Sequence, residues 1–225
     1  MQSLTAVVLG ATGMIGELLV QQLLADPGFS KVRILVRRPL QISHAKLEMV
    51  VTNFSNLNEY KNNIGAGDCI FCCIGTTMRQ VKGDKVLYRS IDYDIPVNAA
   101  KFGKAAGFTS YLLVSAVGAN ASASNFYLKL KGEVEKAILD ISYKATHIFQ
   151  PSILLGKRKE FRLGETIGKG IMQFFSPLFL GGTKKFRGIQ ALDVAKAMVN
   201  ASKQNKAGSF IYQYLAISKL AHQAH

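Results

Sequence analysis

The chain has 225 residues and a mass of 24.6 kDa, enough for one substantial α/β domain or two small ones. Its net charge of +14 fits either a nucleic-acid binder or an enzyme with a polyanionic cofactor. With 48% apolar and 19% charged residues, it is not a disordered, collagen-like or disulfide-scaffold protein. No apolar run reaches the ~18 residues of a membrane span. Three cysteines agree with a reducing compartment, so we expect a cytoplasmic protein.

Short β-rich runs alternate with longer helical patterns through the first 150 residues. Continuous apolar strands that alternate with helices are typical of a parallel sheet covered on both faces. The expected strands span residues 5–9, 32–36, 47–51, 68–74, 110–114 and 145–149, and the expected helices span 14–25, 91–106 and 125–141. The predicted fold class is therefore α/β, with a doubly wound, Rossmann-like sheet of six strands.

The regular alternation of strand and helix patterns ends after Pro151. Two further helices are expected over 164–175 and 192–203, and residues 209–212 are a candidate strand. This stretch is too short for a core of its own. We expect a single domain of residues 1–225, in which 151–225 supply a small cap over the carboxyl ends of the strands, where ligands of such sheets bind.

A glycine-rich turn joins the first strand to the first helix. Gly10 permits a tight turn, Gly13 lets the backbone approach a pyrophosphate, and Gly16 lets the helix pack closely on the strand. The spacing is Gly-x-x-Gly-x-x-Gly, one residue longer in its first gap than the common fingerprint. The strand, turn and helix context favours a phosphate-binding turn over a purely structural one.

The second strand ends at Val36 and is followed by Arg37 and Arg38. NAD-selective proteins usually place an acid here to bind the ribose 2′-hydroxyl, whereas arginine accommodates a 2′-phosphate. Residues 34–41 contain no acid. The arginine pair therefore predicts NADP(H), and the alternative is two solvated surface arginines.

Tyr127 and Lys131 lie one helical turn apart, on one face of the expected helix. A nearby lysine should lower the pKa of the phenol, so that the tyrosine can exchange a proton near neutral pH. Ser115 ends the fifth strand, where its hydroxyl can bind a substrate carbonyl. Tyr-x-x-x-Lys alone is a weak motif, but the serine and the upstream glycine turn make it more specific.

Together these motifs resemble the short-chain dehydrogenase/reductase superfamily. The runs 73–77, 114–119, 124–135 and 150–156 are similar to its atypical branch of HIV-Tat-interacting oxidoreductase-like NAD(P)-binding proteins. The resemblance extends from the N-terminus to about residue 200. It implies an NADP(H)-binding Rossmann domain, in which Ser115, Tyr127 and Lys131 are catalytic and Lys131 also binds the nicotinamide ribose.

The resemblance also implies a full set of cofactor contacts. The pyrophosphate would be bound by Gly10, Thr12, Gly13, Met14 and Ile15, the 2′-phosphate by Arg37 and Arg38, the adenosine and ribose side by Cys73, Ile74 and Gly75, and the nicotinamide by Pro151, Ser152 and Ile153. Two positions depart from the wider superfamily. Asp92 stands where many members carry a proton-relaying Asn, and Gln150 replaces an Arg common in the extended members.

The leading function is an oxidoreductase that transfers hydride between NADPH and a small carbonyl or hydroxyl substrate. The alternative is a non-catalytic NADPH-sensing regulatory module with a protein partner. Nucleic-acid binding is disfavoured because no basic stripe with interleaved aromatics is present. No metal site is expected, because the C-x-x-C pair Cys69 and Cys72 should point to opposite faces of a strand. We expect a monomer or a homodimer.

Overall fold

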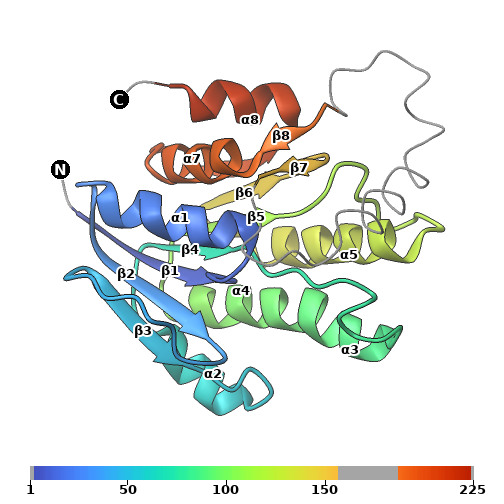
Figure 1. Cartoon of the computed structure of the whole chain (residues 1–225), viewed down its shortest axis with the longest axis horizontal. Coiled ribbons are helices and arrows are strands. Elements are labelled where there is room, and N and C mark those ends of the chain that lie inside the picture. The colour runs from blue at the N-terminus through green and yellow to red at the C-terminus, as the bar shows by residue number, and fades with distance from the viewer. Residues whose placement is uncertain (1–2, 157–186, 224–225) are drawn as a thin grey trace.

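A computed structural model describes residues 3–156 and 187–223. In that part of the chain, seven parallel strands form one sheet in the order β3-β2-β1-β4-β5-β6-β9 (Figure 1). The strands are β1 (Leu4–Leu9), β2 (Phe29–Val36), β3 (Leu47–Val51), β4 (Cys69–Cys72), β5 (Ser110–Val114), β6 (Ala145–Phe149) and β9 (Gly208–Tyr212). A separate parallel pair joins β7 (Leu154–Leu155) to β8 (Ile189–Gln190). The predicted doubly wound α/β class is confirmed.

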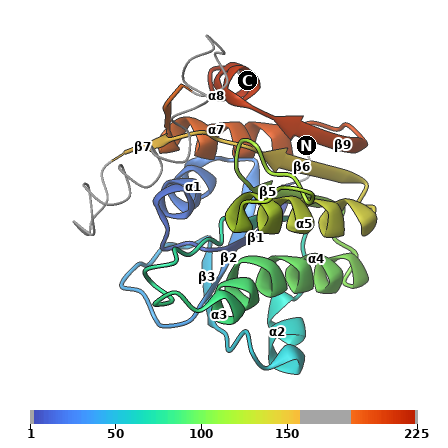
Figure 2. The ribbon, with the colours of Figure 1, turned by 90° about the vertical axis from the view of Figure 1, so that its right-hand side faces the viewer.

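Helices cover both faces of the sheet (Figures 1 and 2). On one face lie α1 (Met14–Ala25), α7 (Ala191–Ser202) and α8 (Tyr214–Ala221), and on the other lie α2 (Leu57–Ile64), α4 (Ile95–Ala105) and α5 (Phe126–Asp140). Because the crossovers place helices on both faces, most residues of the central strands are buried. The sequence pattern missed α2, a short helix whose N-cap Asn56 accepts a hydrogen bond from the backbone N–H of Glu59.

The cysteines of β4 illustrate this two-sided burial. Cys69 packs in the core under α1 and α7, whereas Cys72 packs in the core under α4 and α5. Both are free thiols, and burial raises the pKa of each. Their opposite orientation confirms the expectation for residues three apart in a strand.

The last third of the chain extends the sheet. β9 pairs in parallel with β6 along its whole length, and α7 packs against α1. The prediction of six strands is therefore one strand short, because residues 209–212 do join the sheet. The helix expected over 164–175 lies outside the described residues.

The helix expected over 91–106 is a composite. It begins as α3 (Lys85–Arg89), passes through a π-helical turn η1 (Ser90–Asp94) and continues as α4. Pro96 has no N–H for the carbonyl of Asp92, and the N–H of Ile95 bonds instead to the carbonyl of Ser90, five residues back. This wider turn coincides with a fully buried Asp92.

The length and composition of a helix determine whether it can cross a membrane. None of the helices in the described part of the chain is long and apolar enough to cross a bilayer.

Candidate active site

The glycine-rich turn is built as a backbone cradle. Gly10 has φ +80°, and a Cβ there would lie 2.6 Å from the carbonyl of Cys73, in the loop after β4. A Cβ on Gly16 would lie 2.0 Å from the carbonyl oxygen of Gly10, so glycine is needed for α1 to pack this closely. Gly13 caps α1 without any side-chain hydrogen bond. The start of α1 lies next to the exposed Thr12 and Gly13 and thus offers backbone N–H groups without an intrahelical acceptor at a positive dipole end, which fits a pyrophosphate.

The other predicted pyrophosphate contacts surround this turn. Thr12 is exposed and Met14 is half-buried, whereas the Ile15 side chain is buried in the core. Ile15 can therefore contact a phosphate through its backbone but not through its side chain. After β4, Cys73 and Ile74 are half-buried and Gly75 is exposed. The N–H of Cys73 donates to the carbonyl of Leu9, which fixes this loop beside the turn.

The two arginines lie at the neighbouring strand end. Arg37 and Arg38 directly follow β2, which pairs with β1 through Leu9 and Leu35. Both are exposed, and neither makes an ion pair with any described residue. They therefore share the carboxyl edge of the sheet with the glycine-rich turn and are free to meet an anion.

Tyr127 and Lys131 lie on one face of α5, joined to η1 by a buried ion pair. The Lys131 ammonium lies 6.0 Å from the centre of the Tyr127 ring and 3.0 Å from Oδ2 of Asp92. The other Asp92 oxygen accepts a 2.7 Å hydrogen bond from the N–H of Thr76. Asp92 therefore ties together the loop after β4, the π-helical turn and α5, a role that the sequence left unassigned.

The electrostatics of this cluster differ from the sequence prediction. Burial raises the pKa of Tyr127, although 38% of the residue stays exposed; Lys131 lowers it and Asp92 raises it. The net shift is upward because burial, the largest effect, outweighs the lowering by Lys131, and Asp92 adds a smaller upward effect. The predicted effect of the lysine is present, but the predicted net lowering of the pKa is not found. Burial of Lys131 lowers its pKa, but Asp92 and Tyr127 raise it above its ordinary value.

Ser115 belongs to a second buried cluster that sequence reasoning missed. Its Oγ donates a hydrogen bond to Oε1 of Glu135, one turn after Lys131 on α5. Nε2 of Gln150 donates to both Glu135 oxygens, at 3.0 and 3.1 Å. Nε2 of Gln213, just after β9, donates to Oε1 of Gln150 at 3.0 Å. The missed signal was the repeat of the four-residue spacing, which places Tyr127, Lys131 and Glu135 on one helix face.

The segment after β6 runs beside Ser115. The N–H of Val117 donates to the carbonyl of Pro151, and the hydroxyl of Ser152 donates to the carbonyl of Arg187. The carbonyl of Ile153 accepts from the N–H of Ile189. The predicted nicotinamide residues are therefore fixed on a defined backbone path at the same end of the sheet.

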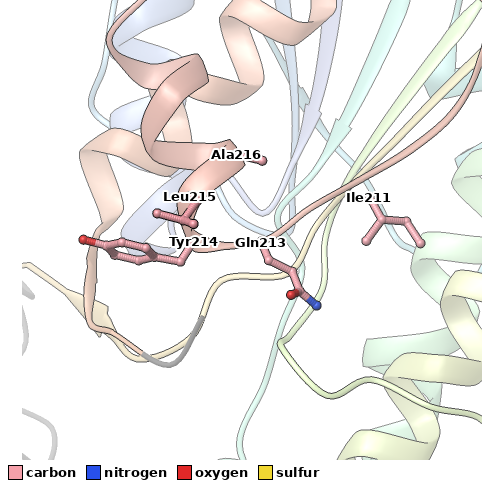
Figure 3. Close-up of a pocket in the computed structure, with 5 residues that line it drawn as sticks. All are labelled: Ile211, Gln213, Tyr214, Leu215 and Ala216. Carbon is pink, nitrogen blue, oxygen red and sulfur yellow. The ribbon is translucent and has the colours of Figure 1, made fainter. Parts of the chain in front are cut away.

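A shallow hollow of about 450 Å³ lies nearby, at the end of β9. Figure 3 shows it lined by Ile211, Gln213, Tyr214, Leu215 and Ala216. The hollow meets the Ser115 cluster only through Gln213, and it contains none of the predicted catalytic side chains. Among the residues the structure describes, no group of three or more His, Cys, Asp or Glu side chains could hold a metal ion.

Comparisons with known proteins agree with this geometry. A family model described as NAD(P)H-binding matches residues 10–154. The chain is 32% identical over 203 residues to Protein HTATIP2 of Rattus norvegicus, covering 89% of this chain and 81% of that protein. It is also 32% identical over 211 residues to Protein FMP52-1, mitochondrial, of Scheffersomyces stipitis, covering 90% and 89%. The solved structure of MoeE5 with UDP-glucose and NAD superposes with a TM-score of 0.70 at 16% identity, covering 96% of this chain and 80% of that one, and supports the fold alone.

The expected cytoplasmic location is overturned by these relatives. The FMP52 proteins of Scheffersomyces stipitis, Eremothecium gossypii, Coccidioides immitis and Candida albicans are all named mitochondrial. The expectation relied on free thiols and on the lack of a long apolar run. Neither feature distinguishes the cytoplasm from a mitochondrial compartment.

The glycine cradle, the parallel sheet and these matches agree with the resemblance found in the sequence. The chain belongs to the NAD(P)H-binding, oxidoreductase-like family of HTATIP2 and FMP52, with the Rossmann-type fold of short-chain dehydrogenase/reductases.

Proposed function

We propose that this protein is an NADP(H)-dependent reductase of small carbonyl compounds. The observation that carries the proposal is the face of α5 that presents Tyr127 and Lys131 beside Asp92, on the same sheet edge as the glycine cradle. A proton donor and a phosphate-binding turn on one sheet edge are the parts that carbonyl reduction by a nicotinamide needs.

Different residues of the chain would bind different parts of the cofactor. The backbone N–H groups of Met14 and Ile15, in the first turn of α1, would hold the pyrophosphate, and Arg37 and Arg38 would hold a 2′-phosphate. The residues from Pro151 to Ile153 would lie against the nicotinamide. When bound, the nicotinamide supplies the hydride; the remaining chemistry belongs to the protein.

The protein's own part is to place and move one proton. Tyr127 would donate its phenolic proton to the carbonyl oxygen of the substrate, which gains negative charge as the hydride arrives. Lys131 stabilises the tyrosinate that forms, because its ammonium lies near the ring. Ser115 would orient the oxygen through its hydroxyl. Burial raises the pKa of Tyr127 and so keeps the phenol in the protonated form that a donor requires, while Lys131 lowers the pKa and favours release of the proton.

Turnover tests this assignment directly. NADPH oxidation is followed across a panel of aldehydes and ketones with the wild type, Tyr127→Phe and the control Tyr214→Phe. We expect Tyr127→Phe to lower kcat by about 10²-fold or more, as for loss of a general acid, while NADPH fluorescence titration gives an unchanged Kd. Equal rates in wild type and Tyr127→Phe would reject the proposed role.

Cofactor choice has its own test. Replacing Arg37 and Arg38 together with Ala should weaken NADPH binding by roughly 10- to 100-fold, the size of one or two hydrogen bonds to a charged group. The affinity for NADH, which lacks the 2′-phosphate, should stay within about twofold. Equal losses for both cofactors would show that the arginines do not select NADP(H).

The hydrogen bond from Ser115 to Glu135 favours a second candidate function. In this arrangement the serine hydrogen is directed away from any substrate oxygen. An NADPH-sensing module that binds a protein partner predicts tight NADPH binding without turnover, and a partner recovered in only one cofactor state. Turnover that depends on Tyr127 would exclude this alternative.

A further inference from the structure

Glu135 is a buried carboxyl group that directly contacts the proposed catalytic serine. Glu135, Ser115 and Gln150 are all buried. The carboxyl accepts hydrogen bonds from the hydroxyl of Ser115 and from the amide of Gln150. Among the described residues no cation forms an ion pair with Glu135. Both side chains that donate hydrogen bonds to Glu135 are therefore uncharged.

This contact restricts what Ser115 can do. A serine hydroxyl has one hydrogen to donate and two lone pairs to accept with. While that hydrogen is given to Glu135, Ser115 can accept a hydrogen bond but cannot donate one to a carbonyl oxygen. A protonated Glu135 reverses the bond, because the acid can donate to Oγ and leave the serine hydrogen free.

We propose that Glu135 is a positioning residue whose protonation sets the direction of the Ser115 hydroxyl. As a carboxylate, Glu135 withdraws the serine hydrogen from the substrate; as a carboxylic acid, it donates to Ser115 and releases that hydrogen toward the carbonyl oxygen. The inference rests on the proposed reductase function and adds a control element to the same site.

The surroundings of Glu135 let it change protonation. Lys131 faces it from the previous turn of α5 and is itself paired with Asp92 of η1. The groups bonded to it from the ends of β5 and β6 are the uncharged Ser115 and Gln150. Burial raises the pKa of Glu135, while Ser115, Gln150 and Lys131 lower it, and the net shift is upward.

The amide of Gln150 is held in one orientation. Its Oε1 accepts from Gln213, so its Nε2 faces Glu135 and can donate to either form of the carboxyl. Figure 3 shows the Gln213 side chain, which also lines the hollow at the end of β9. An arginine at position 150 would instead fix Glu135 as a carboxylate through its permanent charge. The neutral glutamine keeps both protonation states accessible.

Glu135→Gln tests the proposal through kinetics. A glutamine can accept from Gln150 and donate to Ser115 at every pH, as the protonated acid does. We expect the wild-type kcat for carbonyl reduction to fall as Glu135 ionises, and Glu135→Gln to lack that fall and exceed the wild type by about tenfold at the upper end. The control Glu133→Gln, on the same helix but paired with Arg89, should follow the wild-type profile.

A double-mutant cycle separates positioning from general structure. In a Ser115→Ala background, Glu135→Gln should change neither kcat nor its pH profile, because the hydroxyl through which Glu135 acts is gone. An undiminished effect of Glu135→Gln in that background, or an unaltered pH profile in the single variant, would overturn the proposal.

A measurement without turnover distinguishes this inference from the proposed function. The infrared carbonyl band of protonated Glu135, assigned by its loss in Glu135→Gln, is titrated in the wild type and in Ser115→Ala. Removing the hydrogen bond that stabilises the carboxylate should move the midpoint to higher pH. If no carbonyl substrate is reduced but the midpoint moves, the reductase function fails while the coupling stands; an unmoved midpoint refutes the coupling itself.

Discussion

The protonation of His147 should weaken the fold in acid. The imidazole lies in β6 and is almost completely buried, stacked at 5.1 Å on Phe210 and at 5.9 Å on Tyr212. Nδ1 lies 3.0 Å from the hydroxyl of Tyr212, and Nε2 is buried without a hydrogen-bond partner. A charge on this ring would have no counter-ion among its described neighbours. Burial accordingly lowers the pKa of His147 from 6.5 to about 4.

The sign and size of the effect follow from that shift. Below pH 6.5 the unfolded chain binds a proton at this position while the folded chain does not, so the folded state loses stability as the pH falls. The loss grows until the pH reaches about 4, where the folded state also takes up the proton. Between neutral pH and about pH 4.5 the contribution amounts to roughly 2 to 3 kcal/mol. That is a large share of a typical stability of 5–15 kcal/mol.

Urea unfolding at neutral pH and at about pH 4.5 measures the contribution of His147 to stability. His147→Phe keeps the stacking and removes the titration, so its loss of stability on acidification should be smaller than that of the wild type by the stated amount. Tyr212→Phe removes the hydroxyl partner but keeps the imidazole, and it should retain the wild-type pH dependence. Identical pH dependence in His147→Phe and the wild type would refute the reasoning, because burial of the ring would then carry no penalty for its charge.

Four further substitutions, at Gly10, Gly75 and Asp92, probe the turn and the ion pair. Gly10→Ala should lower the free energy of unfolding by about 1–3 kcal/mol and weaken NADPH binding, because the backbone at Gly10 is left-handed and the added Cβ would meet Cys73. Gly75→Ala is the control, since its methyl group would meet nothing within 4 Å, and it should unfold like the wild type. Asp92→Ala should lower the free energy of unfolding, measured by chemical denaturation, by about 3–5 kcal/mol, because it leaves Lys131 buried without its counter-charge. Asp92→Asn should lower it by less, because the amide oxygen can still accept the hydrogen bond from the N–H of Thr76. A Gly75→Ala loss equal to that of Gly10→Ala, or an Asp92→Ala variant as stable as the wild type, would contradict these expectations.

Local signals account for the parts that could be predicted. The glycine turn was predictable because Gly16 is required by close contact with the backbone of Gly10, six residues earlier, and Gly10 has a left-handed backbone that favours glycine. The central strands were predictable because burial on both faces leaves continuous apolar runs. The Tyr127 and Lys131 pair was predictable because it depends only on helical spacing.

The structural features that the sequence did not predict depend on contacts between segments far apart in the chain. Residues 209–212 were a candidate strand, but their place in the sheet was not predicted, because β9 is a partly buried edge strand whose pairing with β6 joins residues about sixty positions apart. Glu135 repeats the spacing of its neighbours, but its role depends on Ser115 and Gln150, which come from two other elements. The pKa of Tyr127 likewise depends on burial, the largest upward effect, and on the opposing charges of Lys131 and Asp92, which the packing of η1 on α5 brings together.

The three groups on α5 suggest a preferred direction for the reaction. Tyr127, Lys131 and Glu135 all have pKa values above their ordinary ones, and burial or the charge of Asp92 raises each of them. Carbonyl reduction consumes a proton, whereas the reverse oxidation needs a tyrosine that has lost one. A site of this kind should therefore favour reduction at neutral pH, with oxidation gaining as the pH rises. Because Asp92 raises the pKa of Tyr127, Asp92→Asn should move the onset of oxidation to lower pH; an onset that stays in place would show that the carboxylate does not set the proton affinity of the tyrosine.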